Sequence, residues 1–393
     1  MTYRTTRRQV ISLAGALLLT TLGLEAAAQA KIGDTMVSRL TATTEPSDFW
    51  QALILEPAPL NAWTRLRDAF QWQSDTDKPR VQEWIEHYRS SPENIAEITE
   101  RARPWLHWIL EQLEARDLPG EIALLPFIES SFAPTARSPH GASGLWQFMP
   151  GTADALGLSR SRGYDGRLDV VASTRAALDY LEQQAEQWYD GDMELSLAAY
   201  NAGAGTVNKA RHAAAHRGEP DDYWHLRLPG ETMHYVPKLL AISAIVAEPE
   251  KHGVELADIA NRPAFATVEL DGPLSLNRAA SLAGTTRAEL EALNPGLLNG
   301  SLSPSNSSVL LVPVEHHDTL MANLESWSPA ERAVAEDTYV VQRGDNLSTI
   351  AALHGVTLTL IRDLNGLDGD LIYEGQTLNI PRPTLAQAQA SSG

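Results

Sequence analysis

The chain has no cysteine among its 393 residues. This excludes disulfides, thiolate metal sites and a cysteine nucleophile, and we expect no lipid anchor on a processed N-terminal cysteine. Positive charge is also scarce, because 31 Lys and Arg stand against 50 Asp and Glu, a formal net charge of −19. Nucleic acids and anionic membranes attract clustered Lys and Arg, so we expect neither as a partner.

The N-terminus carries a targeting pattern. Arg4, Arg7 and Arg8 precede an apolar run over residues 10–24, and Ala28 and Ala30 offer a small-residue cleavage site. This order predicts a signal peptide over residues 1–30, by the general or the twin-arginine route. A transmembrane anchor is the alternative, although the run is short for a bilayer span. We therefore expect an exported protein of the bacterial envelope, with residues 31–60 as a poorly ordered lead-in.

Residues 61–117 show helical spacing of apolar positions. Val81, Trp84, Ile85 and Tyr88 follow the i, i+3, i+4, i+7 pattern of a buried helical face. A second helix opens at Ser91-Pro92, and Pro104 should kink or break it. Its apolar positions are Ile95, Ile98, Ala102, Trp105 and Ile109. The tryptophans fit either core packing or a platform for sugar rings.

Residues 118–250 keep this helical character and predict a mainly α domain. Asp169 is placed to cap one helix, a second helix ends at Gly203, and a third runs from about Glu231 to Ala247. The predicted buried stripe of the first is Val171, Thr174, Leu178, Leu181, Ala185 and Trp188. No strand-like alternation of useful length interrupts this region.

Beyond Pro263 the chain repeats itself. Gly284 and Asn294 in residues 266–313 correspond to Gly355 and Asn365 in residues 338–382, and both pairs are ten residues apart. Each copy predicts a β-α-α-β module. Pro273 replaces the aspartate of the second copy, so the first is degenerate. We expect residues 314–337 to be a linker and residues 383–393 a disordered tail.

One acid stands at the end of an apolar run. Glu129 follows Leu124, Leu125, Pro126, Phe127 and Ile128. Such a setting disfavours the charged carboxylate and raises its pKa, which a general acid for glycosidic cleavage needs near neutral pH. Taken alone, the Glu-Ser pair favours the alternative, a surface glutamate that caps the following segment.

Four further motifs decide between these interpretations. They are Glu129-Ser130, Ser138-Pro139-x-Gly141, Gly144-Leu145-Trp146-Gln147 and Ala199-Tyr200-Asn201-Ala202-Gly203. In this order they resemble the family-1 lytic transglycosylases with a goose-type-lysozyme-like fold, from about Asn61 to Ala247. Residues 338–381 resemble a LysM domain, and residues 266–313 a divergent one. The implied fold is a mainly α lysozyme-like catalytic domain with N-terminal helices, followed by small α+β LysM-like modules.

The resemblance implies an enzyme that cleaves the MurNAc-β-1,4-GlcNAc bond of peptidoglycan without water, forms 1,6-anhydroMurNAc ends and needs no metal or cofactor. Glu129 would be the catalytic acid and then the base. The implied substrate-binding residues are Ser138, Gln147, Met149, Tyr200, Asn201 and Tyr235, although Phe148 and Met149 could equally belong to the core. The implied glycan-binding residues of the LysM module are Gly344, Asp345, Asn346, Leu347, Leu371 and Ile372. Asp345 could also cap the helix that follows.

A second catalytic acid is not evident near Glu129. Asp154, Asp165 and Asp169 follow it, in surroundings that predict helix caps or turns. In the family's reaction the C6 hydroxyl of the substrate attacks within the same sugar, so one carboxylate suffices. A hydrolytic muramidase of the same fold and a non-catalytic peptidoglycan-binding protein remain as alternatives. We expect glycan strands as the partner, and wall association in the periplasm through the LysM module.

Overall fold

The computed structural model describes residues 60–161, 163–270, 274–302, 307–326, 336–365, 367 and 369–381. The predicted signal peptide, the lead-in before residue 60 and the predicted tail lie outside these ranges. Among the described residues, none of the helices combines the length and the apolar character that a membrane span requires.

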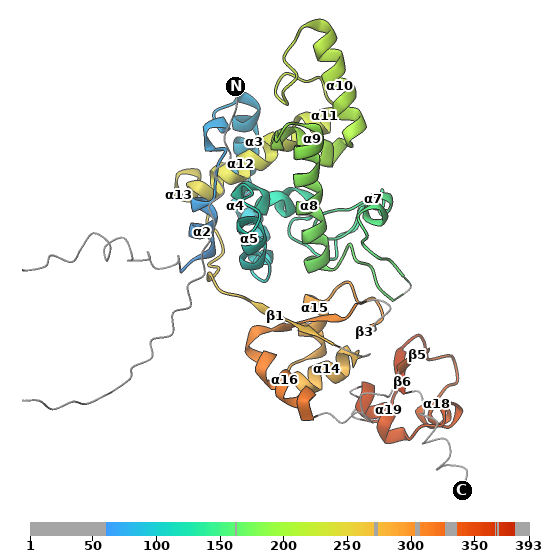
Figure 1. Cartoon of the computed structure of the whole chain (residues 1–393). Coiled ribbons are helices and arrows are strands. Elements are labelled where there is room, and N and C mark those ends of the chain that lie inside the picture. The colour runs from blue at the N-terminus through green and yellow to red at the C-terminus, as the bar shows by residue number, and fades with distance from the viewer. Residues whose placement is uncertain are drawn as a thin grey trace, which may run out of the picture. The chain divides into compact units, whose positions relative to one another are not determined.

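Residues 62–252 form a helical domain (Figure 1). In chain order its elements are α2 (Ala62–Asp68), η2 (Gln73–Asp75), α3 (Pro79–Arg89), α4 (Pro92–Arg101), α5 (Leu106–Glu114), η3 (Gly120–Leu124), α6 (Leu125–Ser130), α7 (Pro150–Ala155), α8 (Val170–Trp188), α9 (Met193–Ala202), α10 (Ala204–Arg217), α11 (Gly230–Met233), α12 (Tyr235–Ala247) and α13 (Pro249–His252). The predicted mainly α fold is confirmed.

The helix boundaries follow the local sequence signals. The break expected at Pro104 separates α4 from α5. Asp169 caps α8 by accepting a hydrogen bond from the backbone N–H of Ala172 at 2.9 Å. Gly203 ends α9 with φ +83°, and α10 begins at the next residue. The predicted stripe of α8 is wrong at Trp188, which is 57% exposed because it is the last residue of the helix.

Helix α12 supplies the centre of the domain core. Leu239, Leu240, Ile242 and Ile245 are fully buried, and each contributes roughly 1.5–3 kcal/mol by leaving water. Trp105 is buried in the same core, with Trp84 and Trp108 partly buried against it. Of the two interpretations of these tryptophans, the structure supports core packing.

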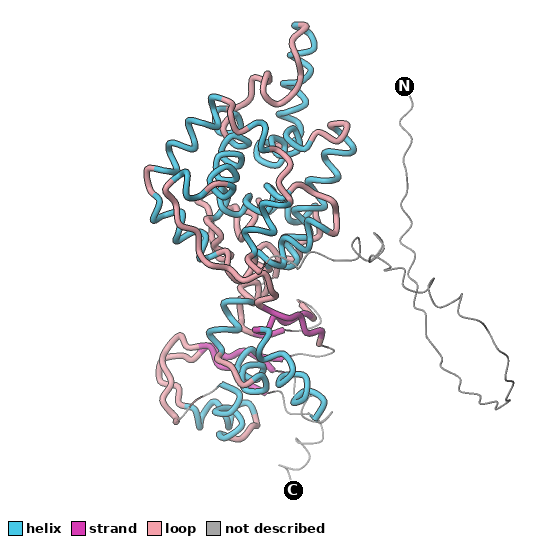
Figure 2. Tube along the Cα trace, turned by 90° about the vertical axis from the view of Figure 1, so that its left-hand side faces the viewer, coloured by secondary structure: helices cyan, strands magenta, loops and turns pink. Residues whose placement is uncertain are grey.

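The strands lie in two small modules after residue 264 (Figure 2). The first contains β1 (Phe265–Glu269), β2 (Leu274–Ser275), α14 (Leu276–Ala283), α15 (Arg287–Leu293), β3 (Ser301–Leu302), β4 (Val309–Pro313), η4 (Val314–His316) and α16 (His317–Ser326). The second contains β5 (Glu336–Val340), α18 (Leu347–His354), α19 (Leu358–Asn365) and β6 (Thr377–Pro381). In both, the first and last strands pair antiparallel, with Thr267 opposite Leu311 and Thr338 opposite Asn379.

The repeated residues hold both modules in the same way. Gly284 and Gly355 end the first helix of each module in the left-handed conformation, with φ +68° and +66°. The amide of Asn294 donates to the Leu311 carbonyl at 2.7 Å and accepts from the Leu311 N–H at 2.9 Å. Asn365 makes the same pair of bonds with Asn379, at 2.8 and 2.7 Å. Each asparagine therefore fastens the second helix to the closing strand.

The segment expected to be a linker is partly helical. Residues 317–326 form α16, and Leu320 is fully buried in the core of the first module. Leu324 is partly buried against the same core. The linker prediction is wrong for these residues, because two apolar positions four residues apart suffice to dock a short helix.

The first module contacts the helical domain. The backbone N–H of Asp165 donates to the Gly296 carbonyl, and that of Leu298 donates to the Gly163 carbonyl, both at 3.0 Å. Phe265 packs against Trp105, with ring centroids 5.8 Å apart. Segment 163–165 is thus hydrogen-bonded to the loop that follows α15.

Candidate active site

Glu129 lies in the last turn of α6. Leu124, Leu125 and Phe127, which precede the acid, are buried in the core of the domain. The two residues that follow α6, Ser131 and Phe132, have φ +54° and +56°, a left-handed conformation that is uncommon outside glycine. This sharp turn ends the helix directly after the acid and is typical of the strain found at functional sites.

Glu129 is partly exposed as a residue, yet its carboxyl is closely surrounded by protein. Burial raises its pKa to about 7, while a hydrogen bond from the Tyr235 hydroxyl to Oε1 and the charge of Lys238 act in the opposite direction. The charge of Glu231 raises the pKa further. Near neutral pH both forms of Glu129 are therefore populated, so it can give up a proton and take one back.

Two tyrosines stand beside this carboxyl, Tyr235, which is buried, and Tyr200, which is partly buried. Tyr235 is the first residue of α12. Burial raises its pKa well above the ordinary value, and the charge of Glu129 raises the pKa further. Burial likewise raises the pKa of Tyr200, whose hydroxyl donates to the Trp146 carbonyl at 2.7 Å. Both tyrosines therefore stay protonated and remain hydrogen-bond donors at neutral pH.

The loop before α7 carries most of the remaining predicted residues. Gly144 has φ +86°, and a Cβ there would lie 1.8 Å from the Arg167 carbonyl oxygen, so only glycine fits. Gln147 has φ +50°, and its Nε2 donates to the Gly144 carbonyl at 2.8 Å. Ser138 Oγ accepts from the backbone N–H of Ala142 at 3.0 Å. The loop is thus closed by its own polar side chains.

The loop is fastened to the Glu129 helix. Ser130 Oγ donates to the Leu145 carbonyl at 2.8 Å, which agrees with the steadying role expected from the sequence. Phe148 is buried, whereas Met149 is 45% exposed and so is not a core residue. Asn201 Oδ1 accepts from the Thr232 hydroxyl at 2.7 Å, which connects α9 to α11.

Some of the other acids are held by structural contacts, and one acts on the pKa of Glu129. Asp169 caps α8, as its sequence context indicated, whereas Asp154 lies within α7 and pairs with Arg160, and Asp165 pairs with Arg167. Glu231 was missed as an acid close enough to raise the pKa of Glu129. With Lys238 it flanks Tyr235 at spacings of four and three residues, and this helical spacing is the signal that could have indicated it.

A second buried carboxyl was also missed. Glu194 lies on α9, and burial raises its pKa to about 7. Its Oε2 accepts from Trp224 Nε1 at 2.7 Å. The contact is with an indole 30 residues away, so no local pattern in the sequence could have indicated it.

In the second module the predicted glycan-binding residues fall on two loops. Gly344 has φ +93°, and Asp345 Oδ2 accepts from the Gln342 N–H at 2.7 Å and the Tyr339 hydroxyl at 2.8 Å. The cap of α18 is Asn346, not Asp345, because its Oδ1 accepts from the Thr349 N–H at 2.9 Å.

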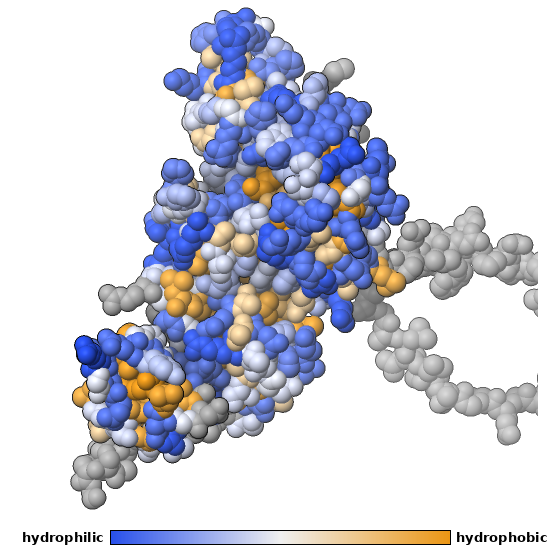
Figure 3. All heavy atoms as spheres, turned by 180° about the vertical axis from the view of Figure 1, so that it is seen from behind, coloured by the Kyte–Doolittle hydropathy of each residue, from blue (hydrophilic) through white to orange (hydrophobic). Residues whose placement is uncertain are grey.

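The predicted glycan-binding residues of the second module differ strongly in exposure. Leu347 is 1% exposed and lies in the module core, and Ile372 is partly buried against it, whereas Leu371 is 70% exposed. Hydrophobic side chains reach the surface of this module (Figure 3). Leu371 is therefore better placed than Leu347 for direct contact with a ligand.

No cluster of three or more His, Asp or Glu side chains suited to a metal ion occurs within the described ranges. The carboxyl of raised pKa and the tyrosine that donates a hydrogen bond to it form an arrangement suited to proton transfer.

Three protein-family models match the chain. Residues 107–222 match the transglycosylase SLT domain, and residues 339–381 match the LysM domain. Residues 264–328 match the LysM-like domain of lytic transglycosylase MltD, a span that includes α16.

Two relatives illustrate the extent of the similarity. Membrane-bound lytic murein transglycosylase D of Escherichia coli (strain K12) is 37% identical over 325 residues, which cover 80% of this chain and 72% of that protein. Membrane-bound lytic murein transglycosylase F 2 of Alkalilimnicola ehrlichii is 35% identical over 121 residues, 30% of this chain and 26% of that protein. The first similarity extends beyond the residues that match the SLT domain.

Proposed function

The chain belongs to the MltD-type lytic murein transglycosylases, and we propose that it cleaves the MurNAc-β-1,4-GlcNAc bond of peptidoglycan non-hydrolytically, leaving 1,6-anhydroMurNAc ends. The observation that carries this proposal is the pair of Glu129 and Tyr235. It combines a carboxyl whose pKa is about 7 with a donor that holds one of its oxygens.

In the first step Glu129 is the acid. Because Tyr235 donates to Oε1, the carboxyl proton is on Oε2, the oxygen available to the substrate. This proton passes to the glycosidic oxygen as the C1–O bond of MurNAc breaks, and N-acetylglucosamine leaves with a free hydroxyl. The acetamido group of MurNAc can stabilise the positive charge that develops on C1.

In the second step Glu129, now ionised, is the base. It removes the proton of the C6 hydroxyl as O6 bonds to C1 and closes the anhydro ring. Tyr235 stabilises the carboxylate in this interval, because a hydrogen bond to the charged form favours that form. The proton returns to Glu129, so the enzyme is regenerated without water.

A single carboxyl suffices for this reaction. Ordinary glycosidases need a second acid to attack or to activate water. Here the nucleophile is part of the substrate, and intramolecular attack supplies the effective concentration that a second acid would provide. The pairing of Asp154 and Asp165 with arginines and the capping role of Asp169 support this assignment.

We assign substrate binding to Ser138, Gln147, Met149, Tyr200 and Asn201, with Tyr235 as the partner of Glu129. The exposed side chain of Met149 and the loop bonds of Ser138 and Gln147 support the assignment.

For the second module we propose glycan binding through the loops of Gly344–Leu347 and Leu371–Ile372, which would keep the enzyme at the wall in the periplasm. Leu371 is the strongest candidate for direct contact because it is exposed. Recovery of the protein with sacculi from a periplasmic fraction would test this location, and recovery in the cytoplasm alone would contradict it.

Mass spectrometry of sacculus digests tests the reaction. We expect muropeptides lighter by one water than hydrolysis products, and none of them with Glu129→Gln. Products with only reducing muramic ends would instead identify a muramidase, and wild-type turnover equal to that of Glu129→Gln would identify a non-catalytic wall-binding protein.

A further inference from the structure

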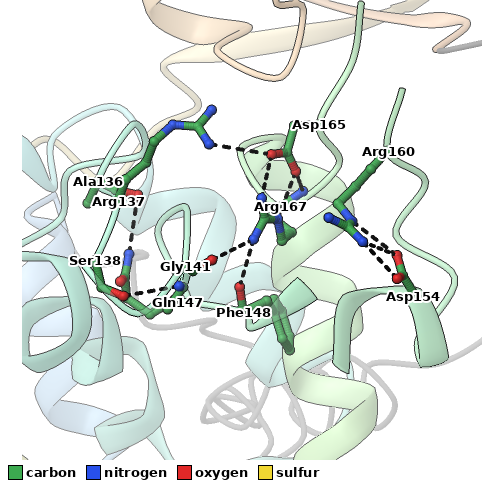
Figure 4. A network of polar contacts seen from close by, with 11 residues as sticks. Ala136, Arg137, Ser138, Gly141, Gln147, Phe148, Asp154, Arg160, Asp165 and Arg167 are labelled. Atoms are coloured by element: carbon green, nitrogen blue, oxygen red, sulfur yellow. Dashed lines mark hydrogen bonds and ion pairs between the residues drawn. The ribbon is translucent and has the colours of Figure 1, made fainter. Parts of the chain in front are cut away.

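A buried ion pair lies beside the loop of residues 136–148 without taking part in the proposed reaction (Figure 4). Asp165 and Arg167 are 5% and 6% exposed. Arg167 donates from Nε to Asp165 Oδ1 at 3.0 Å and from Nη2 to Asp165 Oδ2 at 2.8 Å. A bidentate pair of this kind fixes the guanidinium plane as well as its position.

The remaining nitrogen of Arg167 faces the loop. Nη1 donates to the carbonyls of Gly141 and Phe148, at 2.8 and 3.4 Å. These two residues stand on either side of Gly144 and Gln147 in the sequence, so one nitrogen bonds both flanks of the segment. A lysine could not make these bonds and the bidentate pair together, because its ammonium is a single point donor.

The backbone of Arg167 contacts the same loop. Its carbonyl oxygen occupies the space that a Cβ on Gly144 would need. Side chain and main chain of one residue therefore define both the flanks and the middle of the loop.

Two bonds connect this loop with the catalytic residues. The Leu145 carbonyl accepts from Ser130, the neighbour of Glu129. The Trp146 carbonyl accepts from Tyr200. A displacement of the loop would therefore alter the sugar-binding surface and its register with Glu129.

We propose that Asp165 and Arg167 are positioning residues that hold the 136–148 loop in the form that receives the glycan, a role that rests on the proposed function. The first module braces the pair, because the Gly296 carbonyl accepts from the backbone N–H of Asp165. The first module, which has Pro273 in place of the loop aspartate, would therefore support the catalytic domain mechanically.

The test compares Arg167→Met with Arg160→Met in the full-length protein. Arg160 also pairs with an aspartate, Asp154, but this pair is more exposed, and among the described residues its side chains make no hydrogen bond to the loop (Figure 4). Hydrogen–deuterium exchange of residues 136–148 and the KM and kcat for soluble glycan fragments are measured. For Arg167→Met we expect faster exchange confined to the loop, and kcat/KM lower by about 10- to 100-fold, mainly through KM.

Arg167→Lys keeps the charge and separates positioning from simple charge loss. We expect it to restore exchange and KM only in part, with the pH profile of kcat unchanged, and Arg160→Met to match wild type throughout. If Arg167→Met does not fold, Arg167→Lys is measured alone by the same readouts. Wild-type loop exchange and KM in a folded Arg167 variant, or faster exchange spread evenly over α8 and α12, would overturn the proposal. The exchange result does not depend on whether the product is anhydro or reducing.

Discussion

The hydroxyl of Tyr235 donates a hydrogen bond to Oε1 of Glu129, although 106 residues separate them in sequence. Tyr235 opens α12, which forms the centre of the core, whereas Glu129 ends the short helix α6. A helix buried in the domain core thus orients a carboxyl on a short helix. In the proposed reaction the second oxygen of this carboxyl serves the substrate.

Replacing Tyr235 by Phe should change the pH dependence of turnover. The hydrogen bond favours ionised Glu129, so its loss raises the pKa above the present value of about 7. The alkaline limb of the kcat profile should therefore move to higher pH. At neutral pH kcat should fall roughly 10- to 100-fold, because a bond to a charged group is lost in the base step.

Tyr223→Phe is the matched control for this experiment. Tyr223 is 1% exposed, and its hydroxyl donates to the Thr232 carbonyl at 2.8 Å, so the change also removes a buried hydrogen bond. We expect lower thermal stability and an unmoved pH profile. An unmoved profile in Tyr235→Phe as well would refute the role given to that hydroxyl.

Glu129→Gln should stabilise the protein at alkaline pH. The folded-state pKa of about 7 lies above the ordinary value of 4.5, so the stability contributed by protonated Glu129 is complete below pH 4.5 and is lost as pH rises through 7. Gln has no charge to bury, so the variant should gain roughly 1–3 kcal/mol over wild type above pH 7 and nothing below pH 4.5. Urea denaturation at pH 4 and pH 8 measures this, and an equal difference at both pH values would speak against a raised pKa.

Gly144→Ala should be far more damaging than Gly203→Ala. Both glycines have positive φ, at +86° and +83°, so each substitution strains the backbone by about 1–3 kcal/mol. Only at Gly144 would the new Cβ also meet the Arg167 carbonyl, while nothing lies within 4 Å at Gly203. We expect a clearly larger fall in Tm for Gly144→Ala, and similar Tm values would contradict the close packing of the loop.

Leu371→Ser should weaken binding to isolated sacculi with little effect on stability. The side chain is 70% exposed, so its removal costs little in the folded state. Leu353→Ser is the control, because Leu353 is 69% exposed in the same module but lies on α18, outside the two predicted loops. Co-sedimentation with sacculi should fall several-fold only for Leu371→Ser, and equal binding by both variants would reject this loop as the contact.

The features that the sequence predicted correctly depend on local chemistry. The raised pKa of Glu129, the cap at Asp169, the break at Pro104 and the repeated Gly284 and Gly355 were each indicated by neighbours within a few residues. The same signals explain two errors. Trp188 continues the apolar period but stands at the helix end. In α16 only Leu320 and Leu324 pack against the module core, and two such positions are a weak sequence signal for a helix.

The features that the sequence did not predict depend on contacts between distant segments. Glu231 on α11 and Lys238 on α12 influence Glu129 only because the fold brings these two helices beside α6. Glu194 is buried by an indole from another segment. Arg167 was not singled out at all, since its partners Gly141 and Phe148 are about 20 residues away or more and are backbone carbonyls, which carry no side-chain signal.

Digestion of sacculi in heavy-oxygen water tests the central claim most directly. If the C6 hydroxyl attacks and Glu129 only moves protons, the new muramic ends take no oxygen from solvent. We predict 1,6-anhydro products without label from the wild type, and no products from Glu129→Gln. One labelled oxygen at each new muramic end would contradict intramolecular attack and identify the enzyme as a hydrolase.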